Sequence, residues 1–175
     1  MTISELESLI HSSGKDIYSF CEQLTRSRIE AEELYQDIFL QAVQKLDKID
    51  IDNNPKSYLL SIAVMLWKNK KRKRAWRARI APEECLTEEK QEEFSEETTP
   101  EGYVIKAQEV QILKDELKML SDKYQIPLVL YYMEEQSVTE IAKVMKLPKG
   151  TVKSRLYKAR IILKERLIQR GFKAE

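Results

Sequence analysis

Cysteine, histidine and glycine are scarce in this chain of 175 residues, which has two cysteines (Cys21 and Cys85), one histidine (His11) and four glycines. Two cysteines and one histidine cannot supply the four ligands of a structural zinc site, so we expect no metal centre. Only 5 residues are proline, runs of β-branched residues are few, and 34% of the residues are charged, a composition that favours helices joined by short connections. We therefore expect an all-α protein.

Long apolar runs and the usual patterns of catalysis are also missing. No run approaches the roughly 20 apolar residues that span a bilayer, and the N-terminal MTISELESLIHSSGKD lacks the basic-then-apolar pattern of a signal peptide. No pairing of a nucleophile with a base and no Gly-rich phosphate loop is recognisable. We expect a cytoplasmic protein that has no membrane span, is not an enzyme and holds no cofactor.

Charge is segregated along the chain, although the formal net charge is only +1. In residues 68–79, KNKKRKRAWRAR, eight of twelve residues are Lys or Arg, whereas residues 81–102 contain nine Glu and a single Lys. The chain becomes basic again from Lys143 to Arg170. An acidic, apolar-poor segment between two basic ones predicts two small helical domains, residues 1–80 and 106–175, joined by a flexible acidic linker over 81–105. The alternative is that these runs are ordinary solvated helix faces.

The first domain is expected to contain two long helices. Ser27 and Glu30 predict a capping box, after which apolar residues recur with helical spacing, and one or two shorter helices precede it. The turn-rich residues 47–57 lead into a second helix that carries the basic block. An amide-rich loop, an aromatic side chain and a cationic helix suit the binding of unpaired bases and phosphates. The alternative is that Tyr58 and Trp67 belong to the core.

The second domain is predicted to contain three helices. The first spans about 122–133, Ser137 and Glu140 form a capping box for the second, and the third lies within LPKGTVKSRLYKAR (147–160). Hydroxyls and cations of the third helix lie opposite a narrow stripe formed by Val152, Leu156, Ala159 and Leu163. This is the helix-turn-helix arrangement, whose last helix enters the major groove of DNA. Three-helix units of this kind also serve as protein-binding modules.

Three segments resemble the extracytoplasmic-function (ECF) sigma factors, the two-domain minimal class of bacterial RNA polymerase sigma subunits in the sigma-70 family. AEELYQDIFLQA (31–42) and SYLLSIA (57–63) are similar to sigma region two, and EIAKVMKLPKGTVKSRLYKAR (140–160) is similar to region four. The resemblance implies a protein that binds core RNA polymerase, directs it to promoters and promotes strand opening. In the turn of region four, Lys146 replaces the family's usual glycine.

The resemblance implies three sets of site residues. The β′ clamp helices of the polymerase would be bound by Glu33, Leu34, Gln36, Asp37 and Phe39. The minus-10 element of the promoter DNA would be bound by Asn53, Asn54, Lys56, Ser57, Tyr58, Lys68, Lys71, Arg72 and Arg74. The minus-35 element would be bound by Lys149, Thr151, Lys153, Ser154, Arg155, Lys158 and Arg160. The further partners implied are the β flap of the polymerase and an anti-sigma factor.

The residues alone leave two other functions open. A stand-alone helix-turn-helix regulator would bind duplex operator without polymerase, usually as a symmetric dimer. A polycation-driven RNA-binding or antitermination protein would not need the helix in 140–160. The sequence also suggests surplus apolar surface, suited to a partner or to completion of the core, at Tyr131, Tyr132, Met133 and Ile161.

Overall fold

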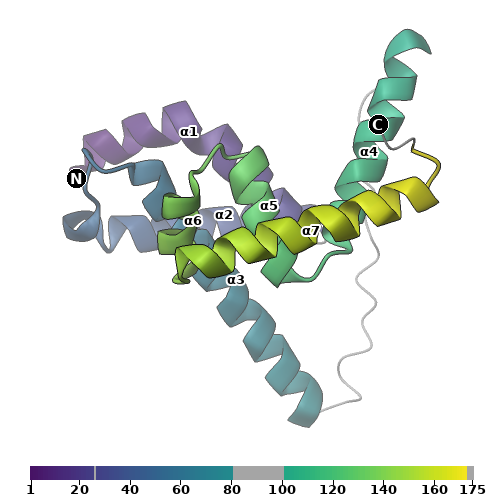
Figure 1. The fold of residues 1–175 in the computed structure, drawn as a ribbon. Coiled ribbons are helices and arrows are strands. Elements are labelled where there is room, and N and C mark those ends of the chain that lie inside the picture. The colour runs from purple at the N-terminus through teal and green to yellow at the C-terminus, as the bar shows by residue number, and fades with distance from the viewer. Residues whose placement is uncertain (26, 81–100, 173–175) are drawn as a thin grey trace. The chain divides into compact units, whose positions relative to one another are not determined.

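The computed structural model describes residues 1–25, 27–80 and 101–172, with side chains from 108 onward in the last range (Figure 1). The elements in chain order are α1 (Ile3–Leu24), α2 (Arg28–Val43), the short 3₁₀ helix η1 (Leu46–Lys48), α3 (Pro55–Ile80), α4 (Glu101–Lys118), α5 (Asp122–Tyr132), α6 (Val138–Met145) and α7 (Lys149–Gln169). The described ranges contain helices and no strand, so the all-α prediction is confirmed. Most of the predicted linker, including Cys85, lies outside the described residues, and α4 begins at Glu101, inside the range predicted for that linker.

The chain divides into two compact units, one built mainly on α1 to α3 and the other mainly on α4 to α7. None of the helices in the described ranges is long and apolar enough to cross a membrane. The exact domain limits proposed from the sequence stay predictions.

Helix α1 is one continuous helix of 22 residues, where the sequence predicted one or two shorter helices. Gly14 lies in its middle and is buried, and a Cβ atom at this position would lie 2.8 Å from the hydroxyl oxygen of Tyr35 in α2. The missing side chain therefore allows α2 to approach α1 closely and does not interrupt the helix. The core of this unit is formed by side chains from all three long helices: Ile17, Phe20, Cys21, Leu34, Ile38, Leu59, Ala63 and Trp67.

The alternative that Tyr58 and Trp67 belong to the core can be compared with their burial. Trp67 is 4% exposed, so the alternative that it belongs to the core is confirmed. Tyr58 is half-buried at the start of α3. Cys21 is a buried free thiol in the same core.

The second unit has the predicted helix-turn-helix arrangement. In α7, Val152, Leu156 and Ala159 are 0%, 3% and 0% exposed, and Leu163 is half-buried, so the predicted stripe is confirmed. Helix α5 packs against α7 and buries an uninterrupted run, Gln125–Leu130. The stripe of α7 thus rests on the preceding helices and leaves its opposite side to solvent.

Local geometry at both ends of α6 also follows the sequence. The N–H of Glu140 donates to the Ser137 hydroxyl oxygen (3.2 Å) and the N–H of Ser137 donates to the Glu140 carboxylate (2.8 Å), which is the predicted capping box. The turn before α7 places Lys146 at φ 55°, the left-handed region in which glycine is favoured. Glycine adopts this conformation without steric cost, which explains the family's usual residue, whereas Lys146 holds it with mild strain.

Helix α4 was not predicted from the sequence, which placed the first helix of this unit at 122–133. The carboxylate of Glu116 in α4 is buried and accepts from Arg170 (2.8 Å) and pairs with Arg166 (3.5 Å) near the end of α7. Val110 and Leu113 of the same helix are exposed, so residues 108–118, the part of α4 with described side chains, lack a clear apolar stripe. Ion pairs therefore contribute to the packing of α4 on α7, and hydrophobic periodicity does not reveal them.

Candidate nucleic-acid and protein interface

The polar side of α2 presents an acidic surface. Glu33, Gln36 and Asp37, three of the residues assigned to polymerase binding, are exposed. Leu34 is 2% exposed and belongs to the core, so its assignment to a contact surface is corrected. The reason is its register, because residues three to four apart fall on one face of a helix and Leu34 precedes Ile38 by four.

Phe39, the remaining residue of the polymerase-binding set, lies in an aromatic cluster. Its ring is half-buried and meets Tyr35 edge-on at 4.8 Å between ring centroids, and Tyr35 meets Tyr18 edge-on at 5.5 Å. Burial raises the pKa of both Tyr35 and Tyr18 above the usual value for a phenol. The three rings form a rigid link between α1 and α2 beside the acidic surface.

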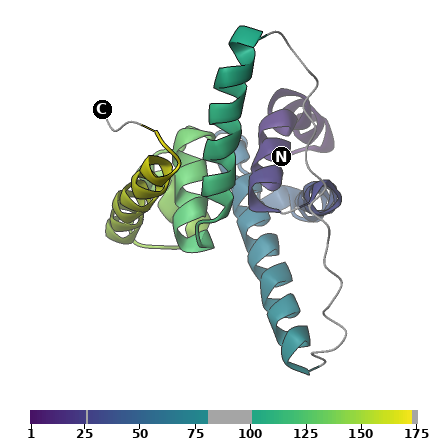
Figure 2. The ribbon, with the colours of Figure 1, turned by 90° about the vertical axis from the view of Figure 1, so that its right-hand side faces the viewer.

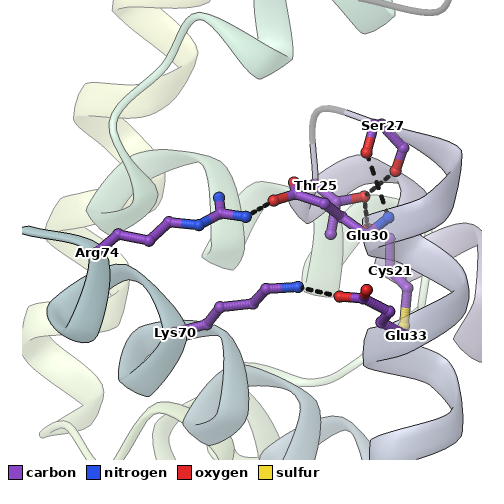
Figure 3. Close-up of polar contacts among 7 residues, drawn as sticks. All are labelled: Cys21, Thr25, Ser27, Glu30, Glu33, Lys70 and Arg74. Carbon is purple, nitrogen blue, oxygen red and sulfur yellow. Dashed lines mark hydrogen bonds and ion pairs between the residues drawn. The ribbon is translucent and has the colours of Figure 1, made fainter. Parts of the chain in front are cut away.

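Two ion pairs join α2 to the basic block of α3 (Figure 3). The Lys70 Nζ atom lies 2.7 Å from the Glu33 carboxylate, and the guanidinium of Arg74 pairs with the Glu30 carboxylate. Glu30 is 3% exposed, whereas the side chain of Glu33 is 58% exposed. Arg74, assigned to DNA binding from the sequence, is therefore turned toward α2 and neutralises a buried acid.

Glu30, the partner of Arg74, also takes part in the cap at the start of α2. The N–H of Glu30 donates to the Ser27 hydroxyl oxygen at 3.2 Å, as the sequence predicted for an N-cap. The neighbouring Thr25 hydroxyl donates to the carbonyl oxygen of Cys21 at 2.9 Å (Figure 3). Ser27 and Thr25 thus hold the backbone at the turn from α1 into α2, where Glu30 meets Arg74.

Asn54, just before α3, and Lys56, in the first turn of α3, both take part in local contacts. Asn54 has φ 50°, and its side-chain oxygen accepts from the N–H of Ser57 at 3.0 Å, which caps the first turn of α3. Lys56 Nζ lies 2.6 Å from the Asp16 carboxylate of α1. Asn53 is exposed, and Ser57 and Tyr58 are half-buried. The start of α3 is thus held by the Asn54 cap and by the ion pair of Lys56 with α1, which the sequence pattern did not reveal.

The second half of α3 presents the cationic surface expected from the sequence. Lys68, Lys71 and Arg72 are exposed, and α3 contains no Asp or Glu along its whole length. Lys71 Nζ lies 5.5 Å from the ring centroid of Trp67, and the Arg72 guanidinium donates to the side-chain oxygen of Asn69 at 3.3 Å. The cations on this side of α3 are exposed to solvent, whereas Lys70 and Arg74 pair with carboxylates of α2.

The outer side of α7 carries the other cationic surface. Lys149, Lys153, Ser154 and Lys158 are exposed, and Thr151 and Arg155 are half-buried. The Ser154 hydroxyl donates to the carbonyl oxygen of Thr151 at 3.0 Å, within the helix. Donors and cations on a helix that follows a tight turn can reach base edges and phosphates in a major groove.

Arg160 differs from the other predicted DNA-binding residues of α7. Its Nε atom donates to the Tyr132 hydroxyl at 2.8 Å, and its guanidinium lies 5.5 Å from the ring centroids of both Tyr131 and Tyr132. The two tyrosine rings meet edge-on at 5.0 Å. Arg160 therefore links α7 to α5 and supplies a positive charge beside exposed aromatic surface.

Comparison with known proteins decides what these two cationic helices belong to. Sigma-70 region 2 matches residues 9–77, and Sigma-70 region 4 matches residues 111–163. The ECF RNA polymerase sigma factor SigW of Bacillus subtilis is 30% identical over 155 residues, which cover 86% of this chain and 82% of SigW. The chain belongs to the ECF sigma factor family.

Other similar proteins span nearly the whole ECF sigma factor described here. The RNA polymerase sigma-E factor of Streptomyces coelicolor is 27% identical over 172 residues, covering 98% of this chain and 91% of that protein. Among solved structures, the sigma factor RpoE in complex with the anti-sigma factor NepR from Bartonella quintana is similar in fold, with a TM-score of 0.76 at 24% identity over 94% of this chain and 98% of RpoE. The chain is thus an RNA polymerase sigma factor that directs promoter-specific transcription, and a stand-alone regulator no longer needs to be invoked.

Sequence reasoning missed several polar contacts that shape this ECF sigma factor. The Glu30 to Arg74 and Glu116 to Arg170 pairs join residues far apart in the chain, and no local pattern could have revealed them. Tyr157, 65% exposed on the outer side of α7, and Trp76, 64% exposed in α3, were not among the predicted site residues. Their signal was available, since both are aromatic residues between cations.

Proposed function

We propose that this ECF sigma factor acts through three surfaces: the acidic side of α2 for polymerase binding, the loop and cationic half of α3 for the minus-10 element, and the outer side of α7 for the minus-35 element. The observation that carries the proposal is the arrangement of α7. A buried stripe fixes its orientation on α5, and exposed Lys149, Lys153 and Lys158 lie on the side that remains. This is the geometry by which a helix-turn-helix unit reads DNA.

For the polymerase, we propose that Glu33, Gln36 and Asp37 contact the β′ clamp helices. Leu34 and Phe39 support this surface from the core and its edge. Since Glu33 also pairs with Lys70, docking of the acidic surface and placement of α3 are coupled through one carboxylate. The unit of α4 to α7 would engage the β flap.

For the minus-10 element, Lys68, Lys71 and Arg72 are proposed to bind phosphates, and Asn53, Ser57 and Tyr58 to meet a base. Asn54 and Lys56 shape the loop by their bonds to Ser57 and Asp16, and Arg74 orients α3 on α2. For the minus-35 element, the proposed contacts are Lys149, Thr151, Lys153, Ser154, Arg155 and Lys158. Arg160 would support this surface indirectly, because its hydrogen bond to Tyr132 links α7 to α5.

The remaining parts of the proposal concern location, chemistry and regulation. The protein would act in the cytoplasm as a non-enzymatic subunit, because the polymerase supplies the transcription chemistry. An anti-sigma factor is proposed as a partner, supported by the complex of the similar RpoE with NepR. Exposed Tyr131, Tyr132, Met133 and Ile161 offer apolar surface for such a contact.

The experiment that tests the proposal is run-off transcription with core RNA polymerase on a pool of fragments from the source genome, with sequencing of 5′ ends. Discrete starts that share upstream minus-10 and minus-35 elements are expected only when the protein is present. The double variant K153A/R155A should lose these starts, and Lys164→Ala, which removes an exposed cation three turns further along α7, should keep them. Absence of starts, together with tight binding of symmetric duplex sites by the protein alone, would overturn the proposal.

A further inference from the structure

The last turns of α3 carry a solvent-exposed indole. Trp76 is 64% exposed, in contrast to Trp67, which is 4% exposed in the same helix. In Figure 2 the C-terminal end of α3 extends beyond α1 and α2. Burying a large aromatic ring is favourable, and leaving it on a cationic helix suggests that a ligand covers it.

Arginines flank this indole on the same side of the helix. Arg72 precedes Trp76 by four residues and Arg79 follows it by three, the two spacings that place side chains next to each other on a helix, and both arginines are exposed. Lys70 and Arg74 instead meet the carboxylates of α2. Since Trp76 is two residues beyond Arg74, it points roughly 200° around the helix from it, toward solvent.

The axial distances suit a short stretch of one nucleic-acid strand. Arg72 and Arg79 are separated by seven residues, which corresponds to about 10 Å along a helix that rises 1.5 Å per residue. One strand of stacked DNA advances about 3.4 Å per nucleotide along the helix axis, so the backbone positions of the two arginines span about three stacked nucleotides. The indole lies between them, where it can stack on the middle base.

We propose that Trp76, with Arg72 and Arg79 on either side, is a stacking site for an unpaired nucleotide of single-stranded DNA. The proposal extends the proposed function, because it continues the phosphate-binding surface of Lys68 and Arg72 by two turns along α3. Every base has a π-face, so such a site accepts any sequence. It would hold a strand next to the melted segment without reading it.

A membrane surface is the competing ligand for a cationic helix with an exposed tryptophan. Interfacial helices bury a broad apolar face, whereas the exposed end of α3 has only Trp76 and Ile80 as large apolar residues among Lys73, Arg77 and the flanking arginines. This apolar area is narrow and interrupted by charge. The composition therefore favours a ligand that is itself polyanionic and has flat apolar faces.

The test uses the full-length protein and an oligodeoxythymidylate of about 12 nucleotides at low salt. Stacking should quench the emission of Trp76, while anisotropy of a labelled copy of the same oligonucleotide gives the dissociation constant. Trp76→Ala and Trp76→Leu should weaken binding by about tenfold, within the range known for loss of one stacking contact, and Trp76→Phe should retain most of the affinity. In Trp76→Phe the remaining indole is the buried Trp67, so emission should no longer respond.

Three results would overturn the site: wild-type affinity in Trp76→Leu, binding without any quenching in the wild type, or a blue shift on anionic vesicles in place of quenching by the oligonucleotide. The last result would assign the indole to a membrane surface. Normal run-off transcription by Trp76→Ala together with unchanged oligonucleotide binding would remove this site and leave the proposed function intact. Quenching by the oligonucleotide without any transcription starts would keep this site and overturn the proposed function.

Discussion

The guanidinium of Arg74 pairs with a carboxylate, that of Glu30, which is almost completely buried at the start of α2 (Figure 3). The side chain of Arg74 is itself 41% exposed. The two partners therefore differ in what happens when the other is lost, because water can reach the cation and cannot reach the acid. The pair joins the cationic half of α3 to the start of α2.

Removing Arg74 should therefore lower the free energy of unfolding more than neutralising Glu30 does. Losing one partner of a fully buried pair costs about 3–5 kcal/mol, and with one half-exposed partner we expect Arg74→Ala to lower the free energy of unfolding by about 2 kcal/mol. Glu30→Gln should cost about 1 kcal/mol or less, since the freed guanidinium can hydrate. Urea unfolding of the two variants measures the difference.

Two further variants make that comparison decisive. In the double variant R74A/E30Q, part of the stability lost in Arg74→Ala should return, because the buried charge is gone. Glu32→Ala, which breaks an exposed pair with Arg28, should change stability by less than about 0.5 kcal/mol. An Arg74→Ala variant no less stable than Glu30→Gln would contradict the interpretation of Glu30 as a buried charge.

Local patterns predicted most of the helix-turn-helix unit but little of what joins helices. The stripe Val152, Leu156 and Ala159 depends on register within one helix, and it was predicted correctly. The pairing of Glu30 with Arg74 depends on the relative placement of α2 and α3 along their axes. The two residues are 44 positions apart in the chain. Sequence reasoning consequently assigned Glu30 a capping role only and Arg74 to DNA.

Leu34 illustrates a different source of error. Its spacing from Ile38 predicted burial, which the structure confirms. The resemblance to sigma region two nevertheless placed Leu34 on the polymerase-binding surface, because a family motif includes the core residues that support a surface as well as those that form it. The physical register was the better guide at this position.

The strained turn before α7 predicts a stabilising substitution. Lys146 has φ 55°, and relieving a left-handed conformation is worth about 1 kcal/mol. Lys146→Gly should therefore raise the free energy of unfolding by up to that amount. The matched change Lys143→Gly, at an exposed position within α6, should lower it by about 1 kcal/mol, because glycine is a poor helix former. Thermal unfolding compares the two, and destabilisation by both would show that the turn is not strained.

The contact of Gly14 with Tyr35 predicts coupled effects. In Gly14→Ala the new methyl would meet the phenol oxygen at 2.8 Å, which should cancel or exceed the gain in helix propensity. Once Tyr35→Phe has removed that oxygen, the same substitution should stabilise the protein by about 0.8–1 kcal/mol. A double-mutant cycle by urea unfolding measures the coupling, and equal effects of Gly14→Ala in both backgrounds would mean that the phenol oxygen does not limit this position.

The outer side of α7 predicts a change in salt dependence. If Lys153 and Arg155 each neutralise one phosphate, replacing either with alanine should reduce the slope of log K against log salt by about 0.9. The double variant should lose about twice that amount, since the two side chains would release separate counterions. The measurement is holoenzyme binding to a promoter fragment from about 50 to 200 mM salt, with Lys164→Ala as the control on the same helix. Weaker binding at an unchanged slope would mean that Lys153 and Arg155 act through base edges or packing, and would remove them from the phosphate-binding surface.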